Sequence, residues 1–202
     1  MSSNKFTYKR IRRFVWRTFV RPLVLKQNNE ARYIIEKKVF PLIKNKKVLL
    51  VGVAEYCDFY PKILEKNNND VWSIDLDSNV TKYGAKKHVV GDISSASKYF
   101  KRDFFDVILM GGVFGYGLND KEAAEKTMSE IFRILKKDGL LIIWWSDSPK
   151  RNMVVPSKLK KYKLFKTISI RGVPTGYKTK EGAVFEFLVK KKVKSICKVI
   201  IF

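Results

Sequence analysis

The chain has 202 residues, of which 42 are basic and 19 acidic, so its formal net charge is +23. This length suits one domain with a substantial core. Two cysteines far apart in sequence argue against a disulfide framework, and a single histidine argues against a structural metal site. No apolar run approaches the roughly 18 residues that a membrane span needs.

The positive charge is concentrated at the two ends of the chain. Residues 1–26 hold eight basic residues and no acidic one, and residues 149–202 hold fifteen basic residues and two acidic ones. Within the first segment, residues 9–20 form a predicted helix with arginines on one side and apolar residues on another. Three interpretations of this helix stay open: packing on the domain, contact with an anionic membrane surface, or binding of nucleic acid.

We therefore divide the chain into three parts. Residues 1–26 are predicted to be a basic amphipathic helix, residues 27–190 a single domain, and residues 191–202 a basic and apolar tail. We expect a cytoplasmic protein, peripheral on the inner face of the membrane if the helix binds there.

The domain is predicted to begin with a helix over Asn29–Phe40 and a buried strand over Lys47–Val51. Gly52 ends this strand, and a glycine there can adopt backbone angles closed to other residues. Asp58 is predicted to cap the next helix, with Pro61 in its first turn.

Two further strands follow. The first covers Val71–Ile74 and is closed by Asp75, after which Asp77 is expected to cap a short helix over Ser78–Tyr83. The second begins at His88, which we interpret as structural because it lies away from the binding edge of the sheet. It ends in Val90-Gly91-Asp92.

A fourth strand, Phe105–Met110, runs into a loop with four glycines between positions 111 and 117. A helix is predicted over Asp120–Lys137, with its lysines at the end where positive charge is favourable. Gly139 then opens a fifth strand over Leu140–Trp145. Tyr162–Arg171 and Ala183–Val189 alternate in polarity and are predicted to form an antiparallel pair.

The order of these motifs resembles that of a class I S-adenosylmethionine (SAM) dependent methyltransferase. The resemblance covers roughly residues 45–190 and includes Phe105–Ile108 and the helix-turn motif Ile131–Gly139. It implies an α/β fold: a Rossmann-like, mostly parallel, doubly wound sheet with a C-terminal antiparallel hairpin, in three α/β/α layers. The first loop departs from the family pattern, since only Gly52 is kept, and Ala54 and Tyr56 replace the next two glycines.

The resemblance also implies SAM as cofactor, bound at the carboxyl ends of the strands. Gly52, Val53 and Ala54 would then hold the methionine end and Asp75 with Leu76 the ribose. Asp92 with Ile93 would meet the adenine, and Met110, Gly111 and Gly112 would lie under the sulfonium. The alternatives from the residues alone are a helix cap for Asp92 and a flexible turn for the glycine loop.

The acceptor side is less defined. Tyr116, Trp144 and Trp145 are candidate substrate contacts, and Asp147 is a candidate general base or simply a turn residue. We expect a small or sugar-type acceptor, in modification of surface polysaccharide or lipid-linked glycan. The alternatives are an RNA methyltransferase, for which +23 would be the electrostatic footprint, and a non-catalytic binding protein that keeps the fold.

Overall fold

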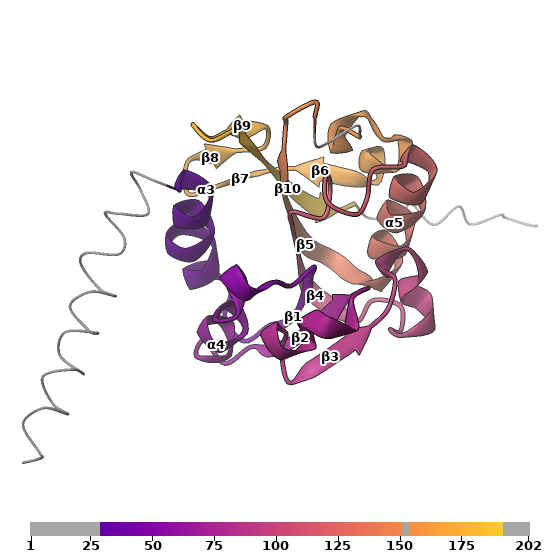
Figure 1. The fold of residues 1–202 in the computed structure, drawn as a ribbon. Coiled ribbons are helices and arrows are strands. Elements are labelled where there is room, and N and C mark those ends of the chain that lie inside the picture. The colour runs from indigo at the N-terminus through magenta and orange to yellow at the C-terminus, as the bar shows by residue number, and fades with distance from the viewer. Residues whose placement is uncertain (1–28, 151–153, 192–202) are drawn as a thin grey trace, which may run out of the picture.

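A computed structural model describes residues 29–150 and 154–191, arranged around one central sheet (Figure 1). The strand order is β3-β2-β1-β4-β5-β10-β6, with β9 also paired to β10, and β7 and β8 form a separate two-stranded sheet. Strands β1 to β5 pair in parallel, whereas β10 runs antiparallel to β5, β6 and β9. This confirms the predicted sheet. The strands are β1 Lys47–Val51, β2 Asp70–Asp75, β3 Lys87–Val90, β4 Phe105–Gly111, β5 Leu135–Ser146, β6 Phe165–Thr167, β7 Ser169–Ile170, β8 Val173–Pro174, β9 Tyr177–Lys178 and β10 Ala183–Lys190.

Helices cover both faces of the sheet. Helix α5, Lys121–Ile134, and the 3-10 segment Ile93–Lys98 contribute to the core cluster on one face. Helices α3, Glu30–Tyr33, and α4, Tyr60–Glu65, contribute to the cluster on the other face. The remaining short 3-10 segments are Phe40–Leu42, Glu55–Cys57, Ser78–Tyr83, Pro156–Lys158 and Lys160–Leu164.

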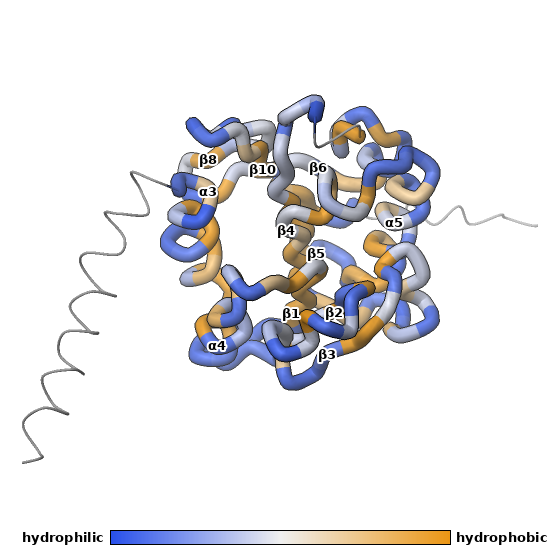
Figure 2. Tube along the Cα trace, in the orientation of Figure 1, coloured by the Kyte–Doolittle hydropathy of each residue, from blue (hydrophilic) through white to orange (hydrophobic). Residues whose placement is uncertain are grey.

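Strand β1 shows why its sequence is a continuous apolar run. Leu49 and Val51 are buried on one face, and Val48 and Leu50 are buried on the other. Successive side chains of a strand point to opposite faces, so a strand covered on both sides has no polar position. In Figure 2 the central strands are accordingly hydrophobic and the outer segments largely hydrophilic.

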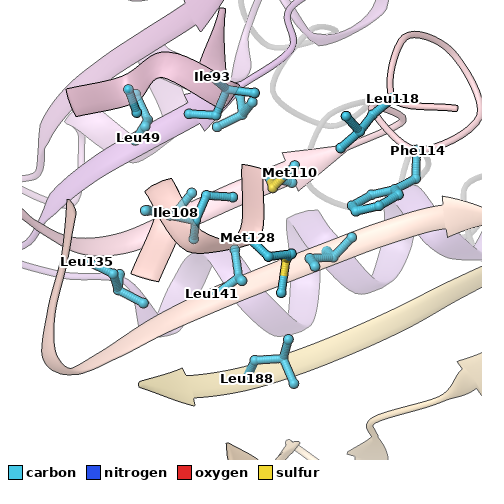
Figure 3. Packing of buried hydrophobic residues seen from close by; sticks show 14 of the residues in the cluster. Leu49, Ile93, Ile108, Met110, Phe114, Leu118, Met128, Leu135, Leu141 and Leu188 are labelled. Atoms are coloured by element: carbon cyan, nitrogen blue, oxygen red, sulfur yellow. The ribbon is translucent and has the colours of Figure 1, made fainter. Parts of the chain in front are cut away.

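The core on the α5 side joins segments far apart in sequence. Met128 of α5 lies among apolar side chains from several strands, all buried (Figure 3). They include Leu49, Ile108, Met110, Leu141 and Leu188. This packing fixes the carboxyl ends of β1, β4 and β5 relative to one another.

The helix predicted over Asp120–Lys137 is shorter than expected. Asp120 does cap it, accepting a hydrogen bond from the Ala123 amide at 2.7 Å, but the helix ends at Ile134. Leu135 is extended and buried, and it already pairs with Phe105 of β4. Burial of Leu135 in the sheet therefore overrides the helical pattern, and Lys136 forms an ion pair with Asp106 at 2.9 Å instead of ending the helix.

The predicted cap at Asp58 is wrong. Residues 55–57 form a 3-10 turn that Asp58 follows, and α4 starts only at Tyr60 with Phe59 as its N-cap. Pro61 lies in the first turn of α4, as predicted.

Two other element boundaries change. The helix predicted over Asn29–Phe40 starts at Glu30 as α3 and continues as a π-helix over Ile34–Val39 and a 3-10 turn over Phe40–Leu42. The strand predicted over Tyr162–Arg171 is broken, because residues 160–164 form a 3-10 segment and only Phe165–Thr167 pair with β10. The predicted helix within residues 1–26 and residues 192–202 of the tail lie outside the described residues.

Candidate functional site

A cleft of about 760 Å³ opens at the carboxyl ends of β1, β2, β4 and β5. In an open α/β sheet this edge is where ligands bind, and the volume is that of a small-molecule site. Eleven of the residues predicted for the site line the cleft: Gly52, Val53, Ala54, Asp75, Leu76, Ile93, Gly111, Gly112, Tyr116, Trp144 and Trp145.

The loop after β1 is held by the acid at the end of β2. One carboxylate oxygen of Asp75 accepts a hydrogen bond from the Val53 amide at 2.8 Å, and the other accepts one from the Asp77 amide at 2.9 Å. Gly52 has a φ of +78°, which a side chain would strain. Asp75 and Gly52 together therefore set the path of the loop along the floor of the cleft.

The glycines at the end of β4 let aromatic side chains approach the backbone closely. A Cβ atom at Gly111 would overlap the indole of Trp144, and Gly112 has a φ of +67°. Beyond Gly112 lie the Tyr56 hydroxyl and the Tyr116 ring, so that two exposed aromatic side chains stand at the mouth of the cleft. The cleft is present despite the tyrosine at position 56, which is one of the residues that line it.

Three predicted site residues do not line the cleft. Met110 is fully buried beneath it. Asp92 caps the 3-10 segment Ile93–Lys98, accepting a hydrogen bond from the Ser94 amide at 2.7 Å. Asp147 forms an ion pair with Lys178.

His88 is placed as the sequence analysis expected. Its Nδ1 lies 2.8 Å from the Ser73 hydroxyl, and burial lowers its pKa. His88 is not among the residues that line the cleft.

The cleft also contains residues that the sequence analysis did not single out, notably Asn29, Arg32 and Glu181. Arg32 and Asn29 belong to the start of α3, and Glu181 lies in the turn between β9 and β10. The only sequence signal for them was the helix predicted ahead of the first strand.

Neither a metal-binding cluster nor a membrane-spanning helix is found among the described residues. Within residues 29–150 and 154–191, no group of His, Cys, Asp and Glu side chains is placed to hold a metal ion. No helix in these same ranges has both the length and the apolar composition needed to cross a membrane.

Comparison with known proteins identifies the family. Residues 55–143 match the family model described as a methyltransferase domain, and they span the cleft from the loop after β1 to β5. Residues 55–143 therefore form a methyltransferase domain, within the Rossmann-like fold of the class I SAM-dependent methyltransferases. The cofactor of this methyltransferase is SAM, and its reaction transfers a methyl group to an acceptor.

Solved structures share the fold of the methyltransferase. The N-methyltransferase NodS from Bradyrhizobium japonicum WM9 superposes with a TM-score of 0.60 at 13% identity, covering 82% of this chain and 99% of NodS. A TehB-like SAM-dependent methyltransferase from Corynebacterium glutamicum superposes with a TM-score of 0.56 at 23% identity, covering 73% of this chain and 82% of the TehB-like protein. The PH0226 protein from Pyrococcus horikoshii OT3 superposes with a TM-score of 0.58 at 17% identity, covering 87% of this chain and 98% of PH0226. None of the curated proteins matches the chain.

Proposed function

We propose that the methyltransferase modifies a small or sugar-type acceptor, in surface-polysaccharide or lipid-linked glycan modification. The observation that carries this proposal is the aromatic mouth of the cleft, where Tyr56, Tyr116 and Trp144 surround Gly112 and Gly111. Flat aromatic faces suit the apolar face of a sugar ring. The cleft is also of a size for a cofactor and a small acceptor together, rather than for a polymer.

The cofactor-binding roles form part of the same proposal. The backbone of Gly52, Val53 and Ala54 holds the methionine end, and Asp75 with Leu76 holds the ribose. Ile93, and Asp92 through the turn that it caps, shape the adenine pocket. Gly111, beneath the Trp144 ring, and Gly112 lie beside the sulfonium, with Met110 buried below them. Bound SAM supplies an activated methyl group, so the residues of the chain mainly position the acceptor in line with it.

The acceptor side is assigned to Tyr116, Trp144 and Trp145. Trp145 is 7% exposed, so it forms the wall of the cleft, and the more exposed Tyr116 is left to contact the acceptor directly. Asp147, the predicted general base, is not included in this proposal because its carboxylate is engaged by Lys178.

The test is transfer of a labelled methyl group from SAM to defined acceptor pools. Nucleotide sugars and polyprenyl-linked oligosaccharides form one pool, and transfer RNA with ribosomal RNA forms the other. Label in the sugar pool supports the proposal, whereas label in RNA alone contradicts it. Tyr116→Ala should lower kcat/KM for the sugar acceptor while leaving S-adenosylhomocysteine affinity within about twofold, since the tyrosine is 66% exposed at the mouth.

The RNA alternative rests on the net charge of +23. Lys160 and Lys161 have exposed side chains, and their backbone amides are fixed on α5 by the carboxylate of Glu125. If RNA is the acceptor, binding should weaken steeply with salt, and Lys160→Glu with Lys161→Glu should weaken it further. The anionic membrane surface predicted for residues 9–21 remains a prediction outside the described residues.

A further inference from the structure

The start of α3 is fixed over the cleft by residues from the far end of the chain. The Ala31 amide donates to a carboxylate oxygen of Glu181 at 2.7 Å, and the Tyr177 hydroxyl donates to Glu30 at 2.6 Å. The Asn29 side chain caps the helix by accepting from the Arg32 amide at 2.9 Å. Arg32 is therefore presented from a defined backbone, and its side chain is directed into the cleft.

The Arg32 side chain lies against the loop that follows β1. Its guanidinium carbon is 5.7 Å from the centre of the Tyr56 ring, within the range of a cation–π contact. Burial raises the pKa of the Tyr56 hydroxyl and of the Cys57 thiol, and the positive charge of Arg32 acts on both in the opposite direction. Two adjacent side chains of this loop, Tyr56 and Cys57, therefore both lie close to the charge of Arg32.

The Arg32 guanidinium has no ion-pair partner among the described residues, although the buried carboxylate of Glu36 lies one helical turn further along the same segment. No carboxylate of the described residues forms an ion pair with Arg32, although the five pairs among them engage lysines elsewhere. Among the described residues that line the cleft, Arg32 is also the only basic one. A half-buried guanidinium that has no carboxylate partner is costly, and a carboxylate is the group that its planar fork matches best.

We propose that Arg32 binds the carboxylate of the methionine moiety of SAM, with Tyr56 holding the guanidinium in place. The inference rests on the cofactor orientation of the proposed function, which puts the methionine end beside Gly52, Val53 and Ala54. It explains the departure of this loop from the family pattern. Tyr56 stands where a glycine is usual, and here its ring supports a side chain that replaces part of the contact made by the glycine-rich backbone.

The test compares two ligands that differ by one group. S-adenosylhomocysteine carries the carboxylate, and 5′-deoxy-5′-(3-aminopropylthio)adenosine is the same molecule without it. Calorimetry gives the ratio of their affinities for the wild type, for Arg32→Met and for Arg102→Met, a control on an exposed arginine outside the cleft. The preference for the carboxylate should fall at least about tenfold in Arg32→Met and stay unchanged in Arg102→Met.

The ratio within one protein does not depend on the folded fraction, so partial unfolding of a variant does not obscure the result. An equal preference in Arg32→Met and wild type overturns the proposal. If the preference is equal but the KM of a carboxylate- or phosphate-bearing acceptor rises, the charge serves the acceptor instead. These outcomes are separate from failure of the sugar-acceptor proposal, in which the carboxylate preference persists but no sugar is methylated.

Discussion

The indole of Trp144 fills the space that a side chain at position 111 would need. The two residues are in register across β4 and β5, and an added Cβ at Gly111 would fall within the ring. Both residues line the cleft, and the absence of a side chain at Gly111 leaves space for the aromatic ring of the neighbouring strand.

Gly111→Ala is accordingly expected to displace Trp144 and to destabilise the protein by about 1–3 kcal/mol, the usual cost of overpacking. Affinity for S-adenosylhomocysteine should fall with it. Urea unfolding and calorimetry measure the two effects. Gly117→Ala is the matched control, because no atom lies within 4 Å of the Cβ that it adds. Equal stability of the two variants would show that Trp144 moves aside without cost.

Asp75→Ala removes the carboxylate that accepts hydrogen bonds from the Val53 and Asp77 amides. We expect S-adenosylhomocysteine affinity to drop by about tenfold or more, because the loop loses its anchor and the ligand loses a charged partner. Asp58→Ala, at an exposed position outside the cleft, should bind as the wild type does. Equal S-adenosylhomocysteine affinities for the wild type and both variants would show that Asp75 does not contribute to ligand binding.

Tyr56 tests whether the tyrosine supports or obstructs the cleft. Tyr56→Phe keeps the ring beneath Arg32 and should retain wild-type affinity for S-adenosylhomocysteine. Tyr56→Ala should weaken binding by about two- to fivefold, the size of an exposed cation–π contact. Tighter binding by Tyr56→Ala would mean that the ring obstructs the ligand.

Glu186 gives a prediction about pH. Its side chain is 3% exposed and accepts a hydrogen bond from the Tyr162 hydroxyl at 2.7 Å. Burial raises the pKa of Glu186 above its ordinary value of 4.5, so the folded state holds this proton more tightly than the unfolded chain. The stabilisation is fully present below pH 4.5 and is lost as pH rises through the raised pKa.

Glu186→Gln keeps the hydrogen-bond acceptor and cannot ionise. Its free energy of unfolding should therefore fall less than that of the wild type between pH 4.5 and 8, as measured by urea denaturation. Parallel pH profiles for the two proteins would show that Glu186 remains ionised in the folded state. Glu65→Gln, on an exposed residue, controls for the loss of one negative charge.

The sheet could be predicted because its information is local. The apolar runs Lys47–Val51 and Phe105–Met110 are long enough to require burial on both faces, and each is followed by glycine. The same locality explains the errors. The end of α5 depends on the pairing of Leu135 with Phe105 across thirty positions of sequence, which no helical pattern contains.

The candidate site was predictable where it follows the strand ends, as at Gly52, Asp75 and Gly111. It was not predictable at Arg32 and Glu181, because their approach depends on how α3 meets the β9–β10 turn. Hydrogen bonds and ion pairs within the protein also decide whether a polar side chain at a strand end is available to contact a ligand. Asp92 and Asp147 occupy the expected strand ends, but a helix amide binds one and Lys178 binds the other.

The hydrogen bond between Ala31 and Glu181 spans 150 positions of sequence, and the hydrogen bond between Glu30 and Tyr177 spans 147. A nascent chain leaves the ribosome from its N-terminus, so β1 to β4 are available to pair long before residue 181 emerges. The start of α3, the wall of the cleft that carries Arg32, can form these hydrogen bonds only near the end of synthesis. Premature termination before the last hairpin would therefore yield a partial sheet without these hydrogen bonds, in which the wall that carries Arg32 is not held in place.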